Sequence, residues 1–243
     1  MSSVQYLGHS TVLVDLDGIR LVTDPLFRRR VGHLLRARPV LRPEELDAVL
    51  ISHAHHDHLD LPSIALVDHS IPVVLPKGLG RLLKRHDDVR EVEEGDELTF
   101  GEVTVRATHA VHDGKRAGGR ASGPALGYAI GGSRRIYFAG DTDLFPEMEG
   151  LVPELDVALI PIWGWGPSLG RGLHLGPKQA AEALTLLKPR IAVPIHWGTY
   201  RPAHRGPGAR FLREPAEKFV REAASLAPEV DVRVLQPGEQ LAL

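Results

Sequence analysis

Four histidines and two aspartates crowd into nine consecutive residues of this chain. Residues 52–60 read Ser-His-Ala-His-His-Asp-His-Leu-Asp. A packed core would not use such a stretch, because burying an unpaired ionisable group is costly. Neutral imidazoles and carboxylates are natural ligands of divalent cations, so the stretch predicts a metal site. A histidine-rich surface loop is the alternative, although such tracts commonly bind metal as well.

The elements around this stretch must position its side chains. The apolar run at residues 48–51 predicts a buried strand. The ligand candidates would then lie at the C-terminal end of a strand, where α/β folds place their sites. His53 and His55 point the same way if the chain stays extended. Asp57 and His58 would face a second position as the chain turns towards a helix.

Four further candidates follow predicted strands or precede a predicted helix. Strands at 103–107, 135–139 and 191–195 would be followed by polar candidates, and a helix would begin near Pro177. The candidates after the three strands, in chain order, are His109 or His112, Asp141 and His196. Spacing alone does not choose between His109 and His112. Asp141 could instead cap a helix, and His174, just before the helix at Pro177, could do the same.

Composition indicates an ordinary globular protein. The chain has 243 residues, enough for one large domain or two small ones, with 43% hydrophobic and 25% charged residues. Its net charge of -2 gives no global attraction for nucleic acid or anionic membranes. Cysteine is absent, which excludes disulfides, thiolate metal ligands and thiol catalysis. With no signal peptide and no membrane-spanning run in the sequence, we expect a cytoplasmic protein.

The pattern His-x-His-x-Asp-His at residues 53–58 resembles the metal motif of the metallo-β-lactamase superfamily. Gly-His-Ser at 8–10 and Thr-Asp-Pro at 23–25 resemble the branch that contains L-ascorbate 6-phosphate lactonase and N-acylphosphatidylethanolamine-type phospholipase D. The resemblance extends from Gly8 to His196. It implies an α/β (α+β) fold, the four-layer αβ/βα sandwich, forming a single hydrolase domain over residues 1–243.

The resemblance also implies a set of site residues. The first metal would be bound by His53, His55 and His112, since the resemblance favours His112 over His109. The second metal would be bound by Asp57, His58 and His196, with Asp141 bridging the two. The supporting residues would be His9, Asp24 and Asp60, and the catalytic ones Asp57 and His174. For Asp24, a turn-forming role before Pro25 is an equal alternative.

Arginines and tryptophans are the candidates for substrate contact. Residues 27–43 contain six arginines and no acid. A solvated loop is the simple interpretation. The other is a cationic flap at the site that binds a phosphate or rests on a lipid surface. We assign the substrate-binding candidates as Arg28, Arg29, Arg30, Trp163 and Trp165, although core packing is the alternative for Trp163.

The function implied is hydrolysis by a hydroxide bridging two divalent metals. Zinc is the first expectation, with manganese or iron as alternatives. We expect a phosphodiester or a phosphorylated lactone as substrate. The alternatives are a nuclease or tRNA-processing enzyme and a catalytically idle metal-binding protein. Among partners we expect a small anionic or ester substrate and no specific nucleic acid, with peripheral membrane contact and a homo-oligomer left open.

Overall fold

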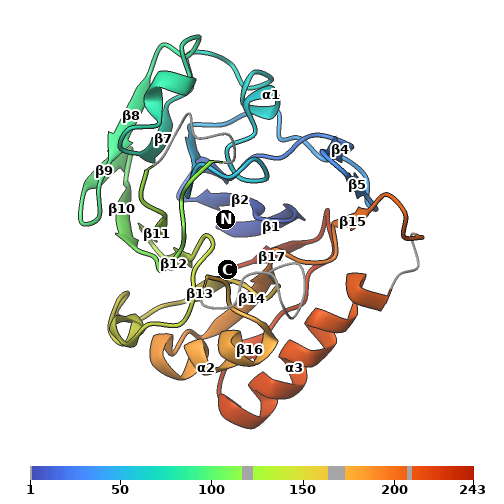
Figure 1. Ribbon diagram of the computed structural model, residues 1–243. Helices are drawn as coiled ribbons and strands as arrows, with labels where there is room; N and C mark the ends of the chain where they lie inside the picture. The colour runs from blue at the N-terminus through green and yellow to red at the C-terminus, as the bar shows by residue number, and fades with distance from the viewer. Residues whose placement is uncertain (1, 117–122, 164–172, 207–209) are drawn as a thin grey trace.

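Two seven-stranded sheets pack face to face in this computed structural model, which describes residues 2–116, 123–163, 173–206 and 210–243 (Figure 1). The first sheet contains, in spatial order, β17 (Gln240–Ala242), β1 (Ser3–Gly8), β2 (Thr11–Leu16), β3 (Ile19–Thr23), β6 (Ala48–Leu50), β7 (Val73–Pro76) and β8 (Val89–Val92). The second contains β16 (Asp231–Val232), β14 (Ile191–Ile195), β13 (Val157–Pro161), β12 (Arg135–Phe138), β11 (Leu126–Gly131), β10 (Val103–His109) and β9 (Glu97–Phe100). The predicted sandwich fold is confirmed.

Apolar side chains from both sheets form the central core. Alternate residues of β2 and β10, such as Val12, Val14, Val103 and Val105, are buried in it. Strands β6 and β13 are buried along their whole length and read as continuous apolar runs. This is expected for strands covered on both faces.

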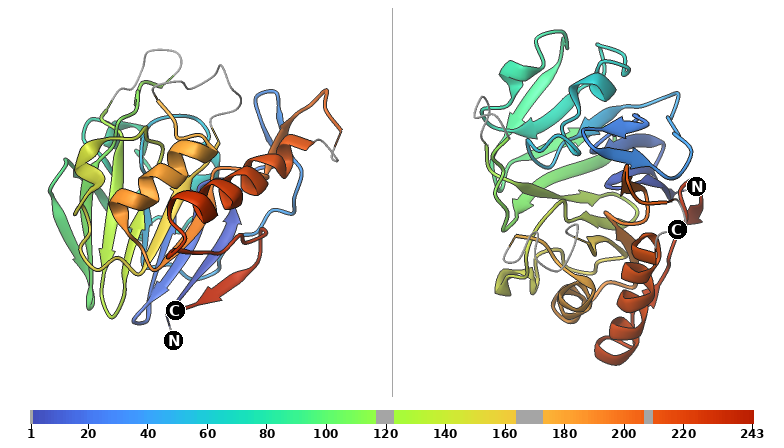
Figure 2. Two further views of the ribbon diagram at one scale, coloured as in Figure 1. Left: turned by 90° about the horizontal axis from the view of Figure 1, so that it is seen from below. Right: turned by 45° about the vertical axis from the view of Figure 1, so that its right-hand side comes forward.

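Helices cover the outer faces of the sandwich (Figure 2). The second sheet carries α2 (Pro177–Leu187) and α3 (Glu214–Leu226), which pack with it around a second apolar cluster. Over the first sheet lie the single turn α1 (Leu61–Ile64) and the 3-10 turn η1 (Gly80–Leu82), on a third cluster. No helix in the described part of the chain is both long and apolar enough to cross a bilayer.

Strand direction collects the predicted ligands at one edge. Strands β10 and β12 both pair antiparallel with β11, so they run the same way. Strands β13 and β14 continue that direction by parallel pairing. The loops after β10, β12 and β14 therefore emerge together.

The arginine-rich residues 27–43 are more ordered than the simple loop interpretation suggests. They contain β4 (Arg30–Val31) and β5 (Leu34–Arg36), which join β15 (Tyr200–Pro202) in a small third sheet. The side chain of Arg36 holds this sheet to the sandwich by donating to the carbonyl oxygens of Leu7 at 2.6 Å and Leu26 at 2.8 Å. The loop interpretation was wrong for residues 30–36, because the bond from Arg36 to Leu7 joins segments far apart in the sequence.

Candidate metal centre

Three of the predicted ligands form a compact histidine group. The imidazoles of His53, His55 and His112 place one nitrogen each within 4.8 Å of the others. The Nδ1–H of His112 donates to the carbonyl oxygen of Leu173 at 2.6 Å, which turns Nε2 towards the group. Burial lowers the pKa of His53 well below its ordinary value and also lowers that of His55. Both imidazoles are therefore neutral at pH 7, the form that binds metal.

His109 lies apart from this group. Its side chain is 45% exposed, and Nδ1 is 2.9 Å from Oε2 of Glu94. The strand β10 ends at His109, so the chain must turn before it can reach the site. His112 sits beyond that turn.

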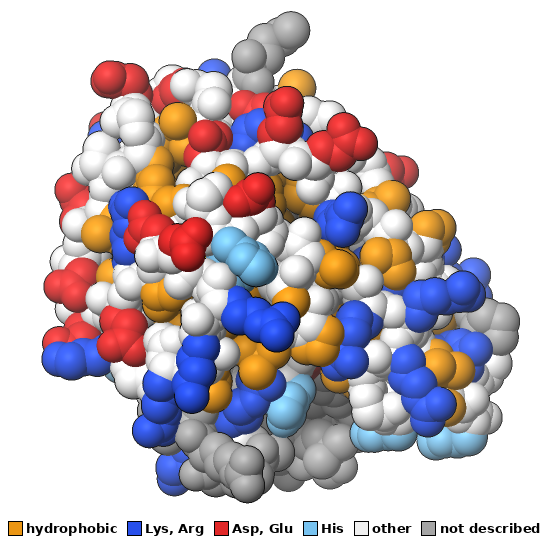
Figure 3. Space-filling view, turned by 90° about the horizontal axis from the view of Figure 1, so that it is seen from above, with side chains coloured by type: hydrophobic (Ala, Val, Ile, Leu, Met, Phe, Trp, Pro, Cys, Tyr) orange, Lys and Arg blue, Asp and Glu red, His pale blue; other side chains and the backbone are white. Residues whose placement is uncertain are grey.

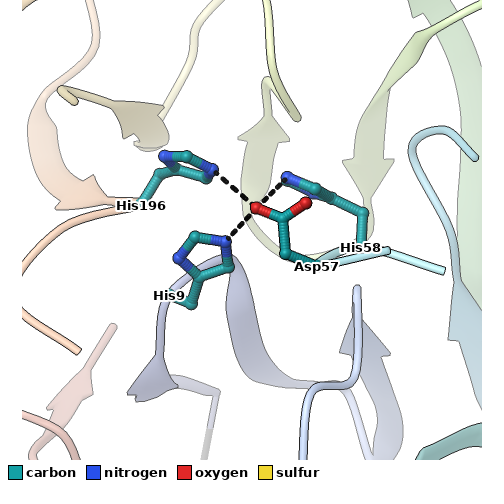
Figure 4. A group of neighbouring side chains, drawn as sticks. All are labelled: His9, Asp57, His58 and His196. Carbon is teal, nitrogen blue, oxygen red and sulfur yellow. Dashed lines mark hydrogen bonds and ion pairs between the residues drawn. The ribbon is translucent and has the colours of Figure 1, made fainter. Parts of the chain in front are cut away.

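The second group combines Asp57, His58 and His196 with His9 (Figure 4). Asp57 Oδ2 lies 2.9 Å from His9 Nε2, 3.7 Å from His196 Nε2 and 3.8 Å from His58 Nε2. Burial by itself would raise the pKa of Asp57, but the charge of His58 and hydrogen bonds from His196 and His9 hold it well below its ordinary value. Asp57 is therefore a carboxylate at neutral pH.

Asp141 lies between the two groups. Its Oδ2 is 3.1 Å from His58 Nε2, 3.4 Å from His196 Nε2 and 4.0 Å from His53 Nε2. Burial opposes ionisation, but His196, His58 and His174 lower the pKa of Asp141 well below its ordinary range. A buried carboxylate in this position could contact cations bound to either group.

A buried relay orients one histidine from each group. Asp24 Oδ2 accepts a hydrogen bond from His58 Nδ1 at 2.6 Å and another from Ser52 Oγ at 2.6 Å. Because the Ser52 hydroxyl donates to Asp24, it accepts from His53 Nδ1 at 2.9 Å. His196 is oriented separately, by donating from Nδ1 to the carbonyl oxygen of Trp163 at 2.5 Å. Metal-binding histidines are commonly fixed in this way through the nitrogen that does not bind metal.

The donor atoms left by this arrangement fit a divalent cation. His53 Nε2, His58 Nε2, His174 Nδ1 and Asp141 Oδ1 are buried and have no hydrogen-bond partner among the described residues. Leaving so many buried polar atoms unsatisfied is unfavourable. Nitrogens and carboxylate oxygens that converge in this way are suitable zinc ligands.

Three residues of the centre have strained backbones. His9, Asp24 and His196 have φ values of 58°, 34° and 61°. Residues other than glycine adopt this left-handed region rarely, at a cost of about 1–3 kcal/mol each, and they cluster at functional sites. These backbone conformations occur where the chain leaves a strand, and they direct the three side chains towards the centre.

His174 lies beside Asp141, close to the start of α2. Its Nδ1 is 3.3 Å from Asp141 Oδ2, and its ring centroid is 4.6 Å from that of His112. Burial lowers the pKa of His174 to about 4. The imidazole is therefore neutral at pH 7. One nitrogen of His174 also falls within metal-binding range of His112 and Asp141.

The remaining predicted residues differ in their contacts and exposure. Asp60 caps α1 and forms an ion pair of 2.7 Å with Arg28, whereas Arg29 and Arg30 are exposed. Trp163 is half-buried against the second apolar cluster. Trp165 lies outside the described residues.

Ser52 and Arg116 were missed by sequence reasoning. Arg116 Nη1 donates to the carbonyl oxygens of Ala54 at 2.7 Å and Leu59 at 2.8 Å, across the loop that carries Asp57. A serine directly before His53 was a usable signal for an orienting hydroxyl. Bonds from an arginine to backbone carbonyls leave no such signal.

The placement of His109 and His112 leads to a direct prediction. His112→Ala should lower the metal content of the first site, because it removes one of three converging nitrogens. His109→Ala should leave metal content near wild type, since His109 interacts with Glu94 instead. Elemental analysis of both purified variants measures the difference, and the reverse pattern would move the ligand role to His109.

Comparison with known proteins gives consistent matches over the whole chain. A family model described as a beta-lactamase superfamily domain matches residues 19–197. A UPF0173 metal-dependent hydrolase of Methanopyrus kandleri is 34% identical over 254 residues, covering 97% of each chain.

Two further matches come from an enzyme and a solved structure. The N-acyl-phosphatidylethanolamine-hydrolyzing phospholipase D 1 of Caenorhabditis elegans is 32% identical over 228 residues, covering 80% of this chain and 63% of that enzyme. The structure of Igni18, a metallo hydrolase from Ignicoccus hospitalis, matches with a TM-score of 0.72 and 25% identity, covering 99% of this chain and 97% of that one.

Proposed function

Since this chain belongs to the metallo-β-lactamase superfamily and is a metal-dependent hydrolase, we propose that it uses two zinc ions to cleave a phosphodiester or a phosphorylated lactone. The proposal of two ions rests on the two ligand groups lying next to each other. His53, His55 and His112 lie on one side of Asp141, and the group with His58 and His196 lies on the other.

Different residues would bind each of the two metal ions. His53, His55 and His112 would bind one ion, Asp57, His58 and His196 the other, and Asp141 both. A bound pair of divalent ions supplies a water of lowered pKa and stabilises charge that develops on the substrate. The relay through Ser52 and Asp24 keeps Nε2 of His53 and of His58 directed inwards. Zinc is the first choice because imidazole nitrogens and carboxylate oxygens are among its usual ligands.

Metal stoichiometry tests the dinuclear proposal. Protein reloaded with zinc should contain about two metals per chain, as in two-metal hydrolases. His55→Ala and His196→Ala should each lower the content to about one, because each removes a ligand from a different group. Elemental analysis and a metal-edge diffraction map measure both the number and the place. A content that stays at one after reloading, with Asp57 and His58 unliganded, would contradict the proposal.

A phosphorylated substrate is supported by the enzyme relative and by local charge. The Caenorhabditis elegans relative is named for hydrolysis of N-acyl-phosphatidylethanolamine, a phosphodiester. Figure 3 shows Lys and Arg side chains gathered over the lower and right-hand parts of one face, with acidic ones mainly towards its upper left. Arg29 and Arg30 contribute two exposed cations close in sequence to Arg28, which pairs with Asp60 next to the ligand loop.

Neutralising these exposed cations should affect charged substrates selectively. Arg29→Gln combined with Arg30→Gln should raise KM several-fold for a phosphorylated substrate and barely change KM for a neutral lactone. The reason is that exposed cations steer anions, an effect that salt weakens. Arg28 is left unchanged because its loss would remove the ion-pair partner of the buried carboxylate of Asp60. Steady-state kinetics at two ionic strengths measure the effect.

The control for this variant changes two exposed cations elsewhere. Lys84→Gln combined with Arg85→Gln removes the same charge from the loop after η1. Equal changes for both double variants, or for both substrates, would assign Arg29 and Arg30 to the fold alone. A screen of zinc- and manganese-loaded protein with bis-p-nitrophenyl phosphate, a lactone panel and a phospholipid would identify the substrate class. Activity on lactones alone would contradict the proposal that the protein cleaves a phosphodiester.

A further inference from the structure

A groove runs beside α3 on the outer side of the second sheet. It encloses about 620 Å³ and is lined by residues of α3, of the arginine-rich segment and of the chain after β14 and β16. Volumes of about 300–1,000 Å³ are typical of sites for small organic ligands. None of the predicted ligands of the metal centre lines it.

The floor of the groove is apolar. Trp197 and Ala216 form its buried part, with 5% and 4% of their surfaces exposed. Val220 lies further out on α3 and is 40% exposed, which makes it one of the few large hydrophobic side chains on the surface. An apolar group placed here would cover Val220 and gain the free energy of removing it from water.

The rim of the groove is cationic. Arg38, Arg213 and Arg221 line it together with a single acid, Glu217. Among the described residues, Arg213 and Arg221 form no ion pair, although other arginines such as Arg233 are paired with neighbouring acids. Arginine suits the planar recognition of carboxylate and phosphate groups.

We infer that this groove binds one amphipathic anion, with its apolar body on Trp197, Ala216 and Val220 and its carboxylate or phosphate head on the arginine rim, where three cations outnumber the single acid Glu217. An apolar floor and a rim whose Arg213 and Arg221 form no ion pair with the described residues together match that chemistry, whereas a neutral or cationic ligand would use only the apolar floor. The site is separate from the metal centre, although Trp197 directly follows His196 in the chain.

Calorimetric titration of the metal-loaded protein tests the inference. Dodecyl phosphate, kept below its critical micelle concentration, should bind with one site per chain. Inorganic phosphate and neutral dodecyl maltoside should each bind at least about tenfold more weakly, because each lacks one half of the recognised chemistry. Arg213→Glu combined with Arg221→Glu should raise Kd by about tenfold or more, as expected when charged hydrogen bonds are lost.

Matched variants separate the groove from the rest of the surface. Arg85→Glu reverses an exposed arginine elsewhere and should change Kd less than about twofold. Val220→Asp should weaken binding, whereas Leu226→Asp, at the same 40% exposure on the same helix, should not. Circular dichroism of each variant confirms that the helices are intact.

Two outcomes would overturn the inference. If the groove variants retain binding, or lose no more than their controls, the amphiphile binds elsewhere, including at the metal centre. If phosphatidylglycerol vesicles bind while monomeric dodecyl phosphate does not, the arginines mark a membrane surface rather than a ligand site.

Discussion

Replacing Asp141 with asparagine should abolish hydrolysis and lower the metal content of both sites. Its Oδ2 approaches His58, His196 and His53, which belong to different ligand groups. The neighbouring histidines hold the pKa of Asp141 well below its ordinary range, so wild-type protein carries this negative charge throughout the neutral pH range. Asparagine keeps the shape and removes the charge that two cations would share. The expected activity is that of the metal-free protein.

Metal analysis beside kinetics makes this result interpretable. Asp143→Asn is the matched control, because Asp143 lies two residues further along and its Oδ1 accepts from the backbone N–H of Leu144 instead. This variant should retain both metals and most of its activity. An Asp141→Asn protein that still binds two metals would mean that the carboxylate does not bridge.

Local pattern indicated the candidate centre through the strands that its residues follow. The buried run before His53 and the strand before His196 fix both the direction of the chain and the edge at which the side chain emerges. The choice of His112 over His109 needed more than spacing, since His109 ends β10 and His112 follows it closely. The structure separates them through the contact of His109 with Glu94.

Contacts between residues far apart in the sequence could not be predicted from the local sequence pattern. Asp24 and Ser52 lie 28 residues apart, and only parallel pairing of β3 with β6 brings them together. The acceptors that orient His112 and His196 are backbone carbonyls, which any residue could supply. Strand β5 was missed because its partner β15 lies more than 150 residues away, and β4 is a two-residue strand that pairs with β5.

His174→Gln should lower kcat by about 10²–10³-fold while both metals remain bound, the range expected when one hydrogen-bond donor to developing charge is lost. His174 has a partly buried imidazole close to Asp141, and its Nδ1 has no hydrogen-bond partner among the described residues. Its pKa of about 4 keeps it neutral at pH 7, so it would donate a hydrogen bond through N–H rather than contribute a positive charge. Such a donor would stabilise the leaving oxygen or the oxyanion.

Leaving-group dependence distinguishes this role from the other two open to His174. An ester with a poor leaving group should lose more activity than a p-nitrophenyl ester, because p-nitrophenolate spreads its charge over the ring and needs little hydrogen-bond stabilisation on oxygen. His109→Gln is the control, since it makes the same replacement at an exposed histidine outside the centre. Loss of metal from the His174 variant would make this residue a ligand, as its distance from His112 and Asp141 permits. Unchanged kcat for every leaving group, with a lowered melting temperature, would restrict it to holding the start of α2.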